Sequence, residues 1–125
     1  MKINPLHLRK WFPALLMMGV IFWFSSRTST QLPNFNWADT LIKKGGHMIG
    51  YALLALSYWH GFRMKGNKRW LSWTLAILYA LTDEYHQSFI HGRHPTVWDV
   101  IVFDNLGALI SLWLANRVMK QKRPD

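Results

Sequence analysis

The residues that could do chemistry are concentrated in the second half of the sequence. They are Asp83, Glu84, His86, Gln87, Asp99 and Asp104. Carboxylates and an imidazole can act as general acids and bases, and carboxylates can also bind a divalent cation. On a helix, Asp83, His86 and Gln87 share one face because they are three and four residues apart. The pattern therefore predicts a polar site.

Some of these residues do not fit a single helix face. Glu84 is rotated by about 100° from Asp83. Asp99 and Asp104 are five residues apart, so a regular α-helix cannot direct both cleanly toward one neighbour. We therefore expect at least one of these two aspartates to serve packing or to contact a different neighbour.

Buried carboxylates need partners, and the sequence offers several bases. We expect Lys44, Arg93 and His86 to pair with the acidic residues, with His47 at the same level. Four carboxylates beside two or three bases cannot all stay ionised. We therefore expect at least one carboxyl group to have a raised pKa or to share a cation.

Long, mainly apolar helical stretches must position these groups. They cover residues 11–26, 45–62, 70–90 and 97–116. The first is shorter than the ~20 residues that cross a bilayer, but Lys10 and Arg27 can extend it by snorkelling. Pro13 falls in the first turn of this run, where proline is tolerated. The sequence predicts a single all-α domain, a four-helix transmembrane bundle formed by residues 1–125.

The distribution of Lys and Arg predicts the orientation. Eleven of the fifteen lie before the first run, between the second and third, or after the fourth; the exceptions are Arg27, Lys43, Lys44 and Arg93. Because cytoplasmic loops carry the excess of basic residues, both termini are expected inside. No small-residue cleavage site follows the first run, so we expect an uncleaved anchor rather than a signal peptide.

Helix rise then gives the depth of each polar group. Asp83 is expected roughly 20 Å from the inner surface, and Asp104 about 10 Å below the outer one. The ionisable residues thus fall in the outer third of the membrane. Because they do not continue into the inner half, transport is disfavoured.

Composition excludes several other functions. The chain has no cysteine, which rules out disulfides and thiolate chemistry. No serine or threonine is obviously placed beside His86, so covalent acyl transfer is disfavoured. The net charge of +9 comes from basic residues that flank apolar runs, so anionic lipids are the expected partners and nucleic acid is not.

Two segments resemble the VanZ-like family of bacterial membrane proteins: KGGHMIGYALLAL and DEYHQSFIHGRHPTVWDVIVFDNLGALI. The resemblance implies a place in the bacterial inner membrane and an association with the cell envelope and resistance to the glycopeptide teicoplanin. It supplies no established reaction. Its pattern selects Lys44, His47, Tyr51, Asp83, Glu84, His86, Gln87, Gly92, Arg93, Asp99, Asp104 and Gly107. Tyr51 is expected to serve packing, and Gly107 to allow two helices to approach closely.

Three functions fit these residues. The first is an enzyme acting on a lipid-linked substrate, in which Lys44, His47, Gln87 and Arg93 bind the substrate and Asp83, Glu84, His86, Asp99 and Asp104 do the chemistry or hold a divalent cation. The second is a binding protein that masks a cell-wall precursor or the glycopeptide. The third is a structural or partner-recruiting membrane subunit.

Overall fold

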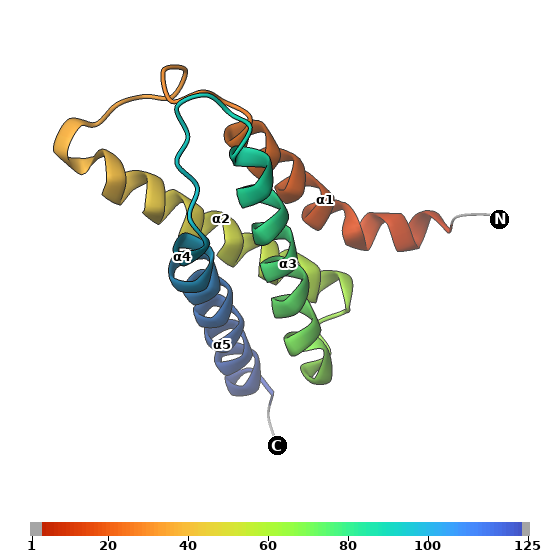
Figure 1. Ribbon diagram of the computed structural model, residues 1–125. Coiled ribbons are helices and arrows are strands. Elements are labelled where there is room, and N and C mark those ends of the chain that lie inside the picture. Colours follow the sequence, from red (N-terminus) through yellow and green to blue (C-terminus); the bar gives the residue numbers. More distant parts are fainter. Residues whose placement is uncertain (1–3, 124–125) are drawn as a thin grey trace.

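The computed structural model describes residues 4–123, which form four long helices and no strand (Figure 1). The first three are α1 (Pro5–Ser25), α2 (Asp39–Gly61) and α3 (Arg69–Gln87), with short helical turns η1 (Asn36–Ala38) and η2 (Gly66–Lys68) before α2 and α3. The fourth runs continuously through α4 (Val97–Asp99), η3 (Val100–Asp104) and α5 (Asn105–Gln121). The all-helical prediction is confirmed.

The helices do not coincide with the apolar runs. α1 begins well before residue 11 because Asn4 caps it, its Oδ1 accepting a hydrogen bond from the Leu6 amide at 3.0 Å. Pro13 therefore lies inside the helix, and its expected place in the first turn was wrong. Proline cannot donate to the carbonyl four residues earlier, which favours a kink. Figure 1 shows α1 bending along its length.

Other helix ends also differ from the predicted bounds, by three to six residues. α2 starts at Asp39 rather than at residue 45, and α3 ends at Gln87 rather than at residue 90. Beyond α3 the chain turns more tightly, and the Ile90 amide donates to the Gln87 carbonyl at 3.0 Å. The fourth helix continues to Gln121, five residues past its apolar run.

α2 is the central helix and packs against α1, α3 and α5. Small residues such as Ala55, Ala80 and Ala108 are fully buried where the helices meet. A Cβ at Gly107 would collide with the backbone carbonyl of Met48, so only glycine permits this approach of α5 to α2. The expectation of close helix contact at Gly107 is confirmed.

Contacts at the helix ends bring the polar residues together. At one end, the ring of Trp11 in α1 packs edge-on against Phe62 after α2, with centroids 4.9 Å apart. At the opposite end lie the connections from α1 to α2 and from α3 to α4, both at the top of Figure 1. There, the Arg93 guanidinium donates to the carbonyls of Phe24 at 2.7 Å and Arg27 at 3.0 Å. The start of α2, the end of α3 and the start of the last helix share this end.

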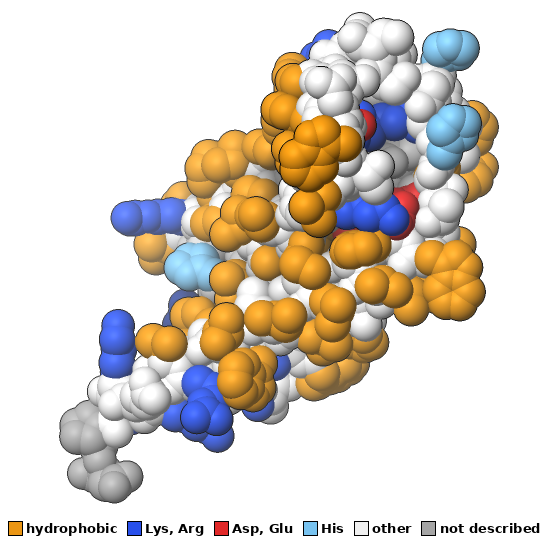
Figure 2. All heavy atoms as spheres, turned by 90° about the vertical axis from the view of Figure 1, so that its left-hand side faces the viewer, with side chains coloured by type: hydrophobic (Ala, Val, Ile, Leu, Met, Phe, Trp, Pro, Cys, Tyr) orange, Lys and Arg blue, Asp and Glu red, His pale blue; other side chains and the backbone are white. Residues whose placement is uncertain are grey.

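The surface is largely apolar between these ends. Figure 2 shows hydrophobic side chains over most of one face, with Lys and Arg side chains at its lower end. Within residues 4–123, one helix, Val97–Gln121, has both the length and the apolar character needed to cross a membrane.

Candidate functional site

A polar pocket of about 270 Å³ lies at the end of the bundle where the two long connections meet. Its lining includes Lys44, His47, Glu84, Gln87, Arg93 and Asp99. Figure 2 shows Lys or Arg, Asp or Glu and His side chains gathered around a hollow in its upper part. Residues that are far apart in the sequence thus meet in one place.

A π-helical turn shapes the wall contributed by the last helix. Val100–Asp104 is π-helical, and the Asn105 amide donates to the Val100 carbonyl five residues earlier. Such a turn holds one residue more than an α-helical turn and is frequent at functional sites. It carries Asp99 and Asp104 to the same side of the helix. The expectation that these two aspartates diverge was therefore wrong, because the helix between them is not regular.

Both aspartates meet α2. Lys44 Nζ lies 3.3 Å from Asp99 Oδ1, which agrees with the expectation that Lys44 pairs with a carboxylate. His47 Nδ1 lies 3.4 Å from Asp104 Oδ1. Lys44 also lies over the ring of Phe103, 4.8 Å from its centre. The Lys44 side chain keeps 40% of its surface exposed, whereas that of Asp104 keeps 1%.

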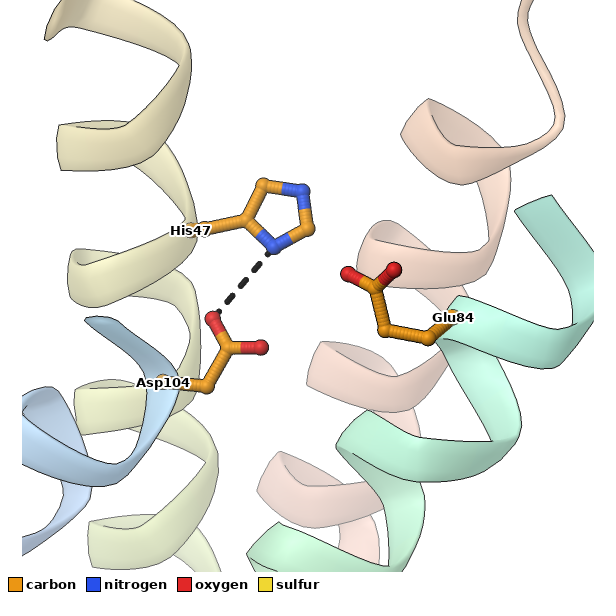
Figure 3. A group of neighbouring side chains, drawn as sticks. All are labelled: His47, Glu84 and Asp104. Carbon is orange, nitrogen blue, oxygen red and sulfur yellow. Dashed lines mark ion pairs between the residues drawn. The ribbon is translucent and has the colours of Figure 1, made fainter. Parts of the chain in front are cut away.

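Glu84 completes a cluster with this second pair. One ligand atom from each of His47, Glu84 and Asp104 lies within 4.8 Å of the other two. Figure 3 shows the Glu84 side chain extending from α3 toward the other two residues. Glu84 is rotated away from Asp83 on α3, as the sequence predicted, but it also faces a cluster of polar side chains.

Asp83 belongs to a separate buried network between α1, α2 and α3. Its Oδ2 accepts hydrogen bonds from the Tyr51 hydroxyl at 3.0 Å and from Gln87 Nε2 at 3.3 Å. Gln87 Nε2 also donates to Ser25 Oγ at 3.0 Å. Asp83 and Gln87 share a helix face, as the spacing predicted.

His86 lies apart from the carboxylates, and its expected pairing with one of them was wrong. Its ring stacks on Phe22, with centroids 4.7 Å apart, and its Nε2 lies 2.9 Å from Ser26 Oγ. A serine does contact this histidine, contrary to the sequence-based expectation. However, the Ser26 hydroxyl donates its one proton to the Phe22 carbonyl at 2.7 Å. His86 must then donate to Ser26, so the histidine does not activate the hydroxyl as a nucleophile.

Arg93 also differs from expectation, because its partners are the backbone carbonyls at the end of α1 rather than a carboxylate. Partial burial lowers the pKa of Arg93, and nearby Asp83 and Glu84 oppose that shift. At the pocket mouth, Lys43 Nζ lies 2.7 Å from Asp39 Oδ2.

Sequence reasoning missed four contributors. Tyr51, expected to serve packing, bonds to Asp83, while Ser25 and Ser26 at the end of α1 contact α3. Lys43 is only 34% exposed and lines the pocket. The available signals were the family pattern, which selects Tyr51, and the expected depth of these residues, which is that of the acidic residues.

A second, apolar groove of about 450 Å³ adjoins the polar pocket between α1 and α2. Its apolar lining includes Met17, Ile21, Phe24, Leu32, Ile42 and Ile49. Lys43, His47 and Arg93 line both cavities. A charged pocket thus shares part of its lining with a groove suited to hydrocarbon.

Comparisons with known proteins agree with the resemblance seen in the sequence. Neither curated proteins nor solved structures gave a match. The family model described as VanZ/LLP1 matches residues 10–119, which is nearly the whole chain. The matched region contains every residue of the polar pocket and of the buried network. The chain therefore belongs to the VanZ/LLP1 family.

Proposed function

We propose that this is a multi-pass protein of the bacterial cytoplasmic membrane that binds a lipid-linked envelope precursor. Its polar pocket takes the phosphorylated head group, and its apolar groove takes part of the hydrocarbon chain. The observation that carries this proposal is that the two cavities adjoin each other and share Lys43, His47 and Arg93 in their linings. An amphiphile needs such a pair of adjoining environments, whereas a soluble anion needs only the first.

Exposed apolar side chains support insertion of all four helices. α1, α2 and α3 have 21, 23 and 19 residues, close to the ~20 that cross a bilayer. Large apolar residues on each helix are exposed, including Leu15 and Phe22 on α1, Ile49 and Leu53 on α2, Leu78 on α3, and Ile110 on α5. A soluble monomer rarely exposes apolar surface on every helix.

The charges support an orientation with both termini inside. Eleven of the fifteen Lys and Arg residues lie within residues 1–10, 63–69 or 117–125. The pocket end carries only Arg27, Lys43, Lys44 and Arg93. Under the positive-inside rule the pocket then faces the outer leaflet. That is where a precursor would present its head group after crossing the membrane.

The cationic residues of the pocket suit a phosphate. Lys44 is paired with Asp99 but remains 40% exposed, so a phosphate could compete for its ammonium group. Arg93 is held by two backbone carbonyls, which fixes its guanidinium at the junction of the cavities. Charged hydrogen bonds to such groups are each worth about 1.5–3 kcal/mol.

The direct test is binding of undecaprenyl phosphate to the purified protein in nanodiscs. We expect saturable binding that is weaker for undecaprenol, which lacks the phosphate, and for a short-chain phosphate ester, which lacks the hydrocarbon. Lys44→Gln should weaken binding by on the order of 10-fold or more. The matched control is Lys120→Gln at the opposite end of the bundle. Equal affinity for undecaprenol and its phosphate would contradict the proposal.

An assay for conversion of the lipid distinguishes an enzyme from a binding protein. The same protein is incubated with undecaprenyl-linked substrates, with and without divalent cations, and the products are analysed. Time-dependent conversion would identify an enzyme, and binding without conversion would identify a protein that masks the precursor. Because the resemblance to VanZ-like proteins implies an association with teicoplanin resistance, the corresponding test in cells is the teicoplanin susceptibility of bacteria that produce this protein.

One observation favours the structural alternative. The Lys44–Asp99 and His47–Asp104 pairs both join α2 to the last helix, so they could serve only to hold the bundle together. In that case Lys44→Gln lowers the amount of folded protein in membranes and leaves no lipid affinity to measure. Normal abundance with weakened lipid binding supports the proposed function instead.

A further inference from the structure

The cluster of His47, Glu84 and Asp104 draws one ligand atom from each of three helical elements. His47 comes from α2, Glu84 from the last turn of α3, and Asp104 from the end of the π-helical turn η3. These atoms lie within 4.8 Å of one another, and Figure 3 shows the side chains converging on one point. The three side chains are therefore held by the packing of the bundle rather than by a flexible loop.

Several atoms in this cluster are buried without a hydrogen-bond partner among the described residues. They are both carboxylate oxygens of Asp104, Oε2 of Glu84 and Nδ1 of His47. Asp104 is 1% exposed and Glu84 is 8% exposed. The 3.4 Å separation between His47 and Asp104 permits charge attraction, but the geometry does not make a hydrogen bond. Buried polar groups in native proteins are nearly always satisfied, so these atoms point to a ligand.

The neighbouring Lys and Arg side chains do not neutralise the carboxylates of Glu84 and Asp104. Lys44 is engaged by Asp99, and Arg93 donates to backbone carbonyls. Asp83 adds a further carboxylate nearby, already bonded to Tyr51 and Gln87. A protonated His47 could neutralise one of the two acids but not both. Within residues 4–123, no Lys or Arg forms an ion pair with Glu84 or Asp104.

We propose that His47, Glu84 and Asp104 bind one divalent transition-metal ion of the Zn²⁺ or Mn²⁺ type. The mixture of one imidazole and two carboxylates suits these ions better than Mg²⁺ or Ca²⁺, which prefer oxygen ligands alone. The separation of His47 Nδ1 from Asp104 Oδ1 is roughly the ligand-to-ligand distance of a tetrahedral site with bonds near 2.1 Å.

Three protein ligands leave coordination positions for another molecule. Metal sites that bind substrates keep such a position open, whereas structural zinc sites close all four. His47 and Glu84 also line the polar pocket, so the open side of the site faces that pocket. The ion can therefore contact a molecule in the pocket, such as a phosphate oxygen. The metal site itself does not depend on the lipid proposal.

The test is metal binding by the purified full-length protein in detergent. The protein is stripped with a chelator and titrated with Zn²⁺ or Mn²⁺ alone, with calorimetry to measure affinity and elemental analysis to measure stoichiometry. We expect one ion per chain and a higher midpoint of thermal unfolding when the metal is present. Asp104→Asn and Glu84→Gln should each weaken binding by at least 10-fold.

The matched control is His60→Gln, which removes an exposed imidazole in the last turn of α2, at the other end of the helix from His47. It should bind the metal as the unchanged protein does. If Asp104→Asn does not fold, Glu84→Gln carries the test, because Glu84 reaches the cluster from the pocket side. Stoichiometric binding that survives Glu84→Gln would overturn the proposal, as would the absence of binding to the unchanged protein. Metal binding without lipid binding would contradict the proposed function and leave this site intact.

Discussion

The Asp99 and Asp104 carboxylates lie on the same side of the last helix, although five residues separate them in the sequence. Each meets a base on α2, at 3.3 Å from Lys44 and 3.4 Å from His47. These two bases are three residues apart and share one helix face. The π-helical turn Val100–Asp104 brings both aspartates to the side that faces α2, because its extra residue makes a separation of five residues close to one full turn.

Removing one residue from this π-helical turn tests that relationship. Deletion of Ile101, which is 51% exposed, leaves Asp99 and Asp104 four apart, a spacing that a regular α-helix places on one face. We expect both ion pairs to persist, and the midpoint of thermal unfolding in detergent to fall by only a few degrees. Deletion of Leu109 in α5 is the control. It turns the rest of the helix by about 100° and removes Leu112 from the core, so a much larger loss is expected.

If both deletions destabilise the protein equally, the π-helical turn is not what aligns the two aspartates. A regular helix in its place would then be as harmful as a rotation of the whole helix.

Close packing of α5 on α2 gives a second prediction. Gly107→Ala places a methyl group against the Met48 carbonyl, which is part of the α2 backbone and cannot move aside easily. We expect a loss of about 1–3 kcal/mol in unfolding free energy, typical of overpacking. Gly19→Ala in α1 is the control, because nothing lies within 4 Å of its added Cβ. Thermal unfolding of both variants in the same detergent compares them, and equal stability would refute the close contact.

The features that could be predicted from the sequence alone are those that depend on local interactions. Apolar runs and spacings of three and four predicted four helices and the shared face of Asp83 and Gln87, because these follow from helix geometry. The π-helical turn was not predictable, since no local preference distinguishes Val100–Asp104 from ordinary helix. The partners of His86 and Arg93 depend on where α1 ends in space, and helical periodicity does not contain that information.

Substitution of Asp83 distinguishes a functional role of its buried network from a structural one. Asp83→Asn keeps an oxygen that can accept the Tyr51 hydrogen bond, and no Lys or Arg among residues 4–123 forms an ion pair with Asp83. We therefore expect normal insertion and abundance with a loss of the proposed lipid-binding phenotype, because Gln87, which bonds to Asp83, lines the polar pocket. Asp99→Asn is the contrast, because it removes the ion-pair partner of Lys44 and should lower abundance. Quantitative immunoblotting of membranes beside the phenotype compares the two, and loss of abundance in proportion to loss of phenotype for Asp83→Asn would refute a functional role.

The side of the membrane on which the pocket lies depends on the topology of the chain. Reporters fused within Arg63 to Arg69, or after Asp125, which lies outside the described residues, should be cytoplasmic, since these segments carry most of the basic charge. Reporters inserted near Phe35 or His94 should be external, because both positions flank the pocket at the opposite end of the bundle. Alkaline phosphatase fusions, active only outside, and fluorescent protein fusions, active only inside, provide paired readouts at each position. A cytoplasmic His94 would move the pocket to the inner leaflet. A mature chain that begins near Thr30 would show that α1 is a cleaved signal, and the Ser25, Ser26 and Arg93 contacts would then be absent from the mature protein.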